Sequence, residues 1–462
     1  MTIKSYIKKL VCFGMMLTLV FMNQCDSAKS NSPTVAKIGD RVITANEFAE
    51  AYEFSSRQIT SKEKSEARQA VLDRMIDRIL LAEKAEEMNL AATDTVMQRA
   101  IDLYRRQAIN RELYQKYVRK PVLINEDEER NAFLRSQMTL YVKHYISDSE
   151  NDIQTILQGK KPFRHSPLYP GVNTIETEVY GPVDLISWND TPSEIEELLY
   201  NLPVGEYSKP FLENQKYHLF QVVDYEKQVI VRDSEFQINR ESIHGILRKR
   251  KETKLAQQFI QSVMKSENLV IKASALNSLT EAIWQNRPTN DKQQMKYIPD
   301  EEIKFLTLDK QVLAGQSIAV FESGTMTVAD ILFNYKVKPQ PVRYDSEQAL
   351  RESLKNAVAF YVREWVFSEK GICEKLDKKS SVIEAERSRR EYLLARKIVN
   401  KVYRECDGRF KDDGEFGNFL TQYIADLKEQ TDIQIFNEQL MAVNTTDEGL
   451  ARKIDFIAVP TQ

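Results

Sequence analysis

The chain has 462 residues, of which 42% are hydrophobic and 29% are charged, so it can form two or three hydrophobic cores. Its 65 basic and 68 acidic residues leave a net charge of −3, which excludes the broad electrostatic attraction on which nucleic-acid binding depends. The histidines lack the paired spacing of metal ligands, so we expect neither a metal nor another cofactor; they are His144, His165, His218 and His244.

The beginning of the chain predicts export. Several lysines precede an apolar run from Leu10 to Met22, which is too short to span a bilayer and is typical of a secretory signal. Cys25 follows this run, and the polar residues 26–33 would suit a flexible tether, so the segment resembles the start of a bacterial lipoprotein. These features predict a signal peptide over residues 1–25, a lipid on Cys25 and a periplasmic protein anchored to a membrane. Plain cleavage nearby and an uncleaved anchor are the alternatives.

Residues 34–132 predict a helical module. Two short strands precede Thr44, which is the expected N-cap of a first helix. From Arg68 to Leu90, apolar residues recur at three- and four-residue spacing, which predicts an amphipathic second helix. Thr93 is expected to cap a third helix.

The same order of elements returns over residues 316–462, which predicts an internal duplication. The segment from Gly324 to Thr327 corresponds to the one from Asp40 to Thr44. Within the long helices, SEKG at Ser368–Gly371 corresponds to AEKA at Ala82–Ala85. The second copy is therefore interpreted as another helical module of the same kind.

Each copy closes with a helix and a short strand. In the first copy residues 228–275 supply this piece, and in the second copy the strand contains Ile433 and Ile435. Residues 276–315 are interpreted as a linker between the two modules. The copies differ in what they enclose, because the first contains a long insert and the second only a Gly-Asp-rich loop.

The insert, residues 133–227, contains short motifs in a definite order. A first strand holds His144, and a loop then holds Asp184 with a leucine and a tryptophan after it. A G-x-x-S-x-P turn runs from Gly205 to Pro210, and a last strand holds His218. In this order and spacing the motifs resemble a parvulin-type prolyl isomerase. The resemblance implies an α/β domain with a small antiparallel sheet.

The resemblance also implies roles for individual residues. The catalytic residues would be His144, His218 and Asp184, and the substrate-binding residues would be Leu185, Trp188, Ile195 and Phe211. Pro182 and Val183 replace two glycines of the family pattern, which predicts a weak or inactive isomerase. Two core histidines that tie adjacent strands together are the alternative interpretation of the pair.

Helical modules around a parvulin domain, behind an export signal, resemble the SurA/PrsA group of extracytoplasmic foldases. This resemblance implies an α+β fold, mostly α, and a periplasmic chaperone with prolyl isomerase character that assists exported or outer-membrane proteins. Its partners would be unfolded or partly folded exported proteins, including their X-Pro segments, and a membrane through the lipid anchor. The alternative is a non-catalytic lipoprotein scaffold that binds one specific partner protein.

Overall fold

The computed structural model describes most of the chain between residues 32 and 445; within this range it leaves out residues 56–62, 170, 214, 229–231, 288–296, 309, 407–409 and 411. The predicted signal peptide, Cys25 and most of the predicted tether lie outside the described residues. Across the described part of the chain, no helix is both long enough and apolar enough to cross a membrane.

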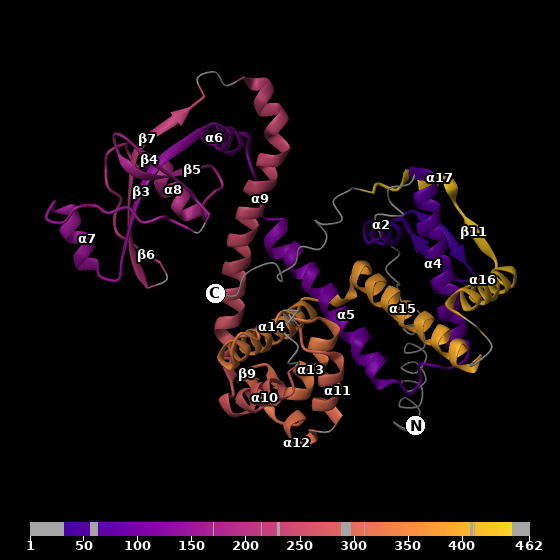
Figure 1. Cartoon of the computed structure of the whole chain (residues 1–462). Helices are drawn as coiled ribbons and strands as arrows, with labels where there is room; N and C mark the ends of the chain where they lie inside the picture. The colour runs from indigo at the N-terminus through magenta and orange to yellow at the C-terminus, as the bar shows by residue number, and fades with distance from the viewer. Residues whose placement is uncertain are drawn as a thin grey trace, which may run out of the picture. The chain divides into compact units, whose positions relative to one another are not determined.

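The chain forms two compact units (Figure 1). Unit 1 combines Met1–Gln115 with Ile260–Gln462, and unit 2 is Lys116–Phe259. Long helices dominate unit 1, and every sheet in the described residues is small and antiparallel. The predicted α+β fold class, mostly α, is confirmed.

The first sheet of unit 1 joins the two ends of the described chain. Its central strand, β1 (Thr34–Ile38), pairs with β2 (Arg41–Thr44) on one side and with β11 (Ile433–Ile435) on the other. Helix α2 (Ala45–Glu53) follows directly, and the side chain of Thr44 accepts a hydrogen bond from the backbone N–H of Glu47. This N-cap satisfies a backbone donor that the helix itself cannot pair, and the prediction of Thr44 as N-cap is confirmed.

The second sheet of unit 1 has the same construction. Strand β9 (Ser317–Phe321) is central and pairs with β10 (Gly324–Thr327) and β8 (Val270–Ile271). Thr327 then caps α13 (Val328–Val337) in a capping box with Asp330. The strand that closes the first predicted copy thus pairs with the second hairpin, and the strand that closes the second copy pairs with the first hairpin. The duplication itself stays a prediction.

Unit 1 contains four long helices: α4 (Lys64–Glu87), α5 (Thr95–Tyr114), α14 (Glu347–Cys373) and α15 (Ser380–Glu405). Helix α15 packs against α4 and α5, and α14 packs against α5. At the α14–α5 contact Gly371 lies so close to Ile109 that a Cβ atom there would clash with the isoleucine side chain. The N-cap of α5 is Asp94 rather than the predicted Thr93, because the Asp94 carboxylate accepts from Met97 N at 2.9 Å.

The predicted linker, residues 276–315, contains packed helices instead: α10 (Ala273–Gln285), α11 (Asp300–Leu308) and α12 (Gln311–Ala314). Helix α10 packs against α14 and buries Leu276, Leu279 and Ile283. The linker prediction is therefore wrong over these helices. The apolar residues of α10 recur at helical spacing, so this segment forms a helix that faces the core and not a solvated connection.

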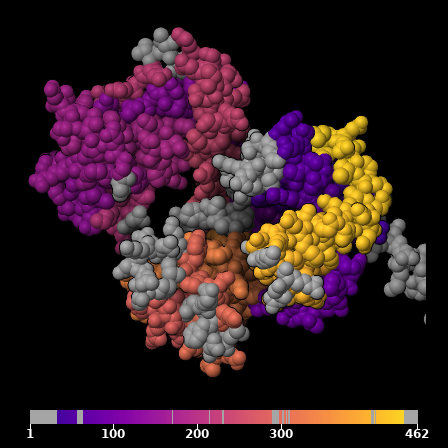
Figure 2. Space-filling model, turned by 45° about the vertical axis from the view of Figure 1, so that its right-hand side comes forward, coloured from indigo at the N-terminus to yellow at the C-terminus, as the bar shows by residue number. Residues whose placement is uncertain are grey.

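The C-terminal helices of unit 1 complete its N-terminal core. Both α16 (Asp413–Glu429) and α17 (Asn437–Ala442) pack against α4. Leu440 and Val443 belong to the same buried cluster as the residues of β1, β2 and α2. Figure 2 shows this C-terminal segment, in yellow, lying against the N-terminal one, in indigo.

Unit 2 is built on a five-stranded antiparallel sheet in the order β4-β5-β3-β7-β6. Its strands are β3 (Met138–Ser147), β4 (Asn173–Thr177), β5 (Gly181–Ser187), β6 (Phe211–Glu213) and β7 (Lys216–Lys227). Its helices are α6 (Glu126–Ser136), α7 (Glu150–Leu157), α8 (Ser193–Asn201) and α9 (Asp233–Met264), the last of which belongs to unit 2 as far as Phe259. Apolar residues of α8 cover one face of the sheet and those of α7 cover the other.

Candidate functional site

The predicted catalytic histidines lie side by side on one face of the unit 2 sheet. His144 is in β3 and His218 is in β7, and these two strands pair along their whole length. Since alternate residues of a strand point to the same face, both rings lie on the face that α8 covers. The His144 ring also stacks on Phe220, with ring centroids 4.9 Å apart.

The hydrogen bonds of His144 define which of its ring nitrogens carries the proton. His144 Nδ1 lies 2.8 Å from the carbonyl oxygen of Ser166, which can only accept, so Nδ1 carries the proton. His144 Nε2 then accepts from His218 Nδ1 at 2.9 Å. Burial lowers the pKa of His144 to about 4, so the ring is neutral at pH 7. His218 thus donates a hydrogen bond to a neutral His144, an arrangement that we call the histidine relay.

Asp184, the third predicted catalytic residue, is fully buried beside this relay. Its carboxylate accepts from Leu168 N at 2.8 Å, from Thr174 Oγ1 at 2.6 Å and from His165 Nε2 at 3.2 Å. His165 Nδ1 in turn accepts from the backbone N–H of His144 at 3.2 Å. The structure thus brings the three predicted catalytic residues together, with His165 between them.

His165 is a member of this cluster that sequence reasoning missed. It lies between α7 and β4, outside every regular element, and the parvulin-like motifs do not include its position. Its only signal is that it is one of the few histidines in the chain. Spacing along the chain does not reveal the contact, because a loop brings His165 back to the sheet.

The predicted substrate-binding residues do not form one surface. Ile195 is buried in the core between α8 and the sheet. Leu185 follows Asp184 directly in β5, so their side chains lie on opposite faces of the sheet. Trp188 packs against the cluster formed by α6 and α9. Phe211 packs against the same buried cluster as Ile195 and meets the His218 ring edge-on, with centroids 6.4 Å apart.

Exposure is low across the histidine cluster. His144 is 1% exposed, His218 is 7% exposed and Asp184 is not exposed at all. A peptide bond therefore reaches these side chains only if the residues above them move. In the described conformation the cluster connects strands and the loop that holds His165.

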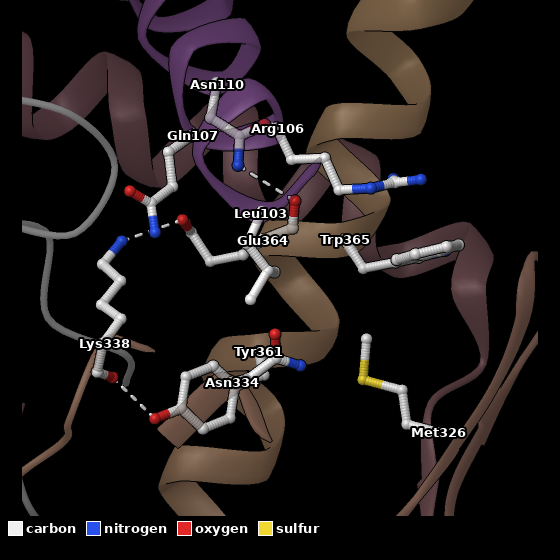
Figure 3. Close-up of a pocket in the computed structure, with 10 residues that line it drawn as sticks. All are labelled: Leu103, Arg106, Gln107, Asn110, Met326, Asn334, Lys338, Tyr361, Glu364 and Trp365. Carbon is white, nitrogen blue, oxygen red and sulfur yellow. Dashed lines mark hydrogen bonds and ion pairs between the residues drawn. The ribbon is translucent and has the colours of Figure 1, made fainter. Parts of the chain in front are cut away.

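A second candidate site lies in unit 1, in a hollow between α5, β10, α13 and α14 that we call the tryptophan groove (Figure 3). It consists of a larger cavity of about 400 Å³, which we call the outer cavity, and a smaller one of about 40 Å³, which we call the inner cavity. Both cavities are lined by Leu103, Arg106, Met326, Asn334 and Trp365, so they adjoin.

Apolar and aromatic side chains line the tryptophan groove together with polar and charged ones. The Trp365 ring lies beneath the guanidinium of Arg106, with 3.8 Å between its Cζ and the ring centroid. Arg99 lies over the ring of Phe333 in the same way, at 4.2 Å. Gly324 lines the outer cavity, and the absence of a side chain there leaves the space beside Trp365 open.

The inner cavity contains polar atoms without partners. Glu364 pairs with Lys338 at 3.1 Å through one carboxylate oxygen, and Asn110 Nδ2 donates to the Glu364 carbonyl at 3.0 Å, as Figure 3 shows. Trp365 Nε1, Asn110 Oδ1 and Glu364 Oε1 are buried and have no hydrogen-bond partner among the described residues. Buried polar atoms are costly when unpaired, so a ligand that pairs these three would gain free energy, but they have almost no accessible surface and the groove must open first.

Comparison with known families identifies the first part of the chain. Residues 2–138 match the family model of the SurA-like N-terminal domain. The N-terminal part of this chain is SurA-like. The match ends at the first residue of β3, so within the described residues it includes β1, β2, α2, α4, α5 and α6. No curated protein matches the chain.

Solved structures similar to this chain include SurA-like chaperones and foldases. A structure from a study of the SurA-like chaperones PEB4 and Cj1289 of Campylobacter jejuni has 16% identity, 52% of this chain and 100% of that chain covered, and a TM-score of 0.22. Peptidylprolyl isomerase PrsA of Bacillus cereus has 15% identity, coverage of 53% and 95%, and a TM-score of 0.21. Foldase protein PrsA of Streptococcus pneumoniae has 13% identity, coverage of 54% and 98%, and a TM-score of 0.20. At these TM-scores none of them carries an argument about this site.

Proposed function

We propose that this protein is a chaperone of exported proteins that holds unfolded polypeptide segments in unit 1. The observation that carries the proposal is the tryptophan groove, which combines apolar walls with buried polar atoms that lack partners. The SurA-like match of the N-terminal part supports it, since the SurA-like relatives are chaperones. An exported chaperone of this kind would work by binding equilibrium, without ATP.

An extended polypeptide has the chemistry that the tryptophan groove needs. Its main chain offers both a donor and an acceptor at every residue apart from proline. These groups would suit Trp365 Nε1 and the oxygens of Asn110 and Glu364 once the groove opens enough to expose them. Its apolar side chains would bury surface against Met326 and Phe333. Methionine and aromatic walls adapt to side chains of different shapes, which favours binding to many clients.

The parvulin-like domain would contribute weak or no isomerase activity. Rotation of an X-Pro bond needs no nucleophile, because a catalyst only has to bind the twisted amide more tightly than the planar one. That binding requires access to the catalytic face, and His144 and His218 are almost completely buried. We therefore assign the histidine relay first to the stability of unit 2 and only second to catalysis.

The holding function is tested by the aggregation of a chemically unfolded client in the presence of the chain from Ser27 onward. Suppression of aggregation at about equimolar ratio, reduced by Trp365→Ala but not by substitution of the exposed Leu123, is the expected result. Tight binding to one folded protein without protection of unfolded ones would instead support the alternative, a scaffold for a specific partner.

The isomerase prediction is tested with short X-Pro peptides. We expect activity near the uncatalysed background, and any excess should disappear in a His144→Ala, His218→Ala variant. Excess activity that survives this double substitution would show that the histidine assignment is wrong.

Export and lipid attachment complete the proposal. We propose that the protein is exported and anchored through a lipid on Cys25, on the basis of the charged and apolar layout of the first residues. Metabolic labelling with a fatty acid tests this, and Cys25→Ser should abolish the label.

A further inference from the structure

Unit 1 contains a second hollow, which we call the arginine groove. It lies on the first predicted copy, at the position that corresponds to the tryptophan groove on the second copy. It has a volume of about 920 Å³ and is lined by residues of α2, α4, α5 and α15. In the predicted alignment of the copies, Met75 corresponds to Tyr361 and Arg78 to Glu364. The first member of each pair lines the arginine groove, and the second lines the inner cavity of the tryptophan groove.

The two grooves have different chemistry at these corresponding positions. Gly324, the first residue of β10, lines the tryptophan groove and leaves it open. Arg41, the first residue of β2, is partly buried instead and bridges Glu47 and Glu391. Four arginines line the arginine groove, and none of the residues that line it is a tryptophan; the arginines are Arg74, Arg78, Arg111 and Arg389.

Three of these four arginines have little or no carboxylate pairing among the described residues. Arg74 is exposed and makes no ion pair there, and Arg78 only approaches Glu391, at 3.7 Å. Arg389 lies over the ring of Tyr104 at 3.7 Å, and its Nε is buried without a hydrogen-bond partner. Stacking holds this guanidinium in place without neutralising its charge.

The carboxylates of the same groove are already engaged or disfavoured as anions. Arg41 holds Glu47, and Arg111 pairs with Glu50 at 3.4 Å. Burial raises the pKa of Glu384, and the nearby Glu47 and Glu50 add to the effect. Arg74 and Arg389 are therefore the cationic side chains of the groove that lack a carboxylate partner among the described residues.

We infer that the arginine groove binds an acidic segment of an unfolded polypeptide, with client carboxylates held by Arg74 and Arg389. Guanidinium groups recognise carboxylates through two parallel hydrogen bonds. The rings of Tyr104 and Tyr392 beneath Arg389 fix the orientation of its guanidinium plane. This inference rests on the proposed holding function and adds a second subsite to it: the tryptophan groove takes apolar segments, and the arginine groove takes acidic ones.

The test measures fluorescence anisotropy of labelled, extended twelve-residue peptides with the chain from Ser27 onward. One peptide carries several Asp and Glu residues, and its matched partner carries Asn and Gln at the same positions. We expect the acidic peptide to bind about tenfold more tightly than the neutral one, with an affinity that falls as salt rises. Equal affinity for both peptides would overturn the inference.

Variants locate the binding. Arg74→Gln with Arg389→Gln should reduce the affinity for the acidic peptide about tenfold, to that for the neutral one. Arg343→Gln with Arg396→Gln removes the same charge from exposed positions of unit 1 outside both grooves and should change the affinity less than about twofold. Equal effects of the two pairs would show non-specific attraction and overturn the inference.

Two further measurements keep the outcomes separable. Arg74→Gln alone tests the groove even if the loss of Arg389 disturbs folding, because Arg74 is exposed and makes no ion pair among the described residues. Protection of an unfolded client poor in Asp and Glu tests the holding function by itself. If the unaltered chain protects the client but does not prefer the acidic peptide, only the arginine groove is refuted. If the unaltered chain does not protect the client, the proposed function is refuted.

Discussion

At the scale of single residues, unit 2 depends on buried polar groups that satisfy one another. Asp184 is surrounded by three donors, and His144 has both ring nitrogens engaged. Such groups are costly to bury and stabilise the fold only while every partner is in place. Substitutions in this cluster should therefore change stability before they change any chemistry.

The titration of His144 makes unit 2 sensitive to acid. Its pKa falls from 6.5 to about 4 on burial, so between these values the unfolded state binds a proton that the folded state does not. The contribution of His144 to the free energy of unfolding is therefore fully present above about pH 6.5. It decreases as the pH falls towards 4, by on the order of 3 kcal/mol. Urea unfolding followed at several pH values checks this, and His144→Gln should flatten the profile. An equally steep profile in that variant would contradict the assignment.

Asp184→Asn should destabilise unit 2 by about 2–3 kcal/mol. An amide NH₂ group in place of one carboxylate oxygen would face donors, leaving at least one of Leu168 N–H, Thr174 hydroxyl and His165 Nε2–H unpaired. Urea unfolding measures the loss. The matched control is Asp190→Asn, an exposed position that accepts one backbone N–H, which should cost less than about 1 kcal/mol.

At the scale of elements, the exchanged strands connect segments far apart in sequence. Strand β11 pairs with β1, and helix α17 after it packs on α4. Arg68 of α4 is 1% exposed and donates to the carbonyl oxygens of Leu440 and Val443. One side chain thus satisfies the backbone at the C-terminal end of α17, where helical carbonyls lack partners.

Arg68→Leu should loosen α17 before the rest of unit 1 unfolds. The substitution leaves two carbonyl oxygens without their donor, which costs about 2–4 kcal/mol if both stay buried. Hydrogen exchange should become faster over residues 433–445 and much less so over α14. Lys64→Leu, an exposed change in the same helix, is the control and should leave the exchange of this segment unchanged.

At the scale of the whole molecule, the chain divides into two units, and unit 2 is inserted between the two segments of unit 1. Each unit has its own buried clusters, with those of unit 2 restricted to residues between Ala132 and Leu247. An insertion of this kind does not interrupt the core of the unit that receives it.

Replacing residues 117–258 by a short Gly/Ser linker should therefore leave unit 1 folded and able to suppress the aggregation of unfolded clients. Both hollows that we assign to client binding lie within unit 1. Circular dichroism, thermal unfolding and the aggregation assay check this expectation. A folded deletion variant that fails to protect clients would move the binding site to unit 2.

Much of the molecule could be predicted because the signals are local. The periodicity of α4 and the cap at Thr44 follow from residues close in sequence. That His144 and His218 would lie in neighbouring strands was implied by the resemblance to parvulins, because β3 and β7 are far apart in the sequence. The order of the parvulin-like motifs likewise predicted that Asp184 would join these histidines.

Only the tertiary structure decided which strands pair and which helices pack together. Strands of two or three residues such as β8 and β11 carry no pattern that favours one hairpin over another, so their exchange depends on the helices that pack around them. His165 and both grooves arise from the same kind of long-range contact. The sequence by itself determined the elements and their order, because these depend on local spacing. The fold decided which surfaces meet, because that choice depends on how the whole chain buries its apolar faces.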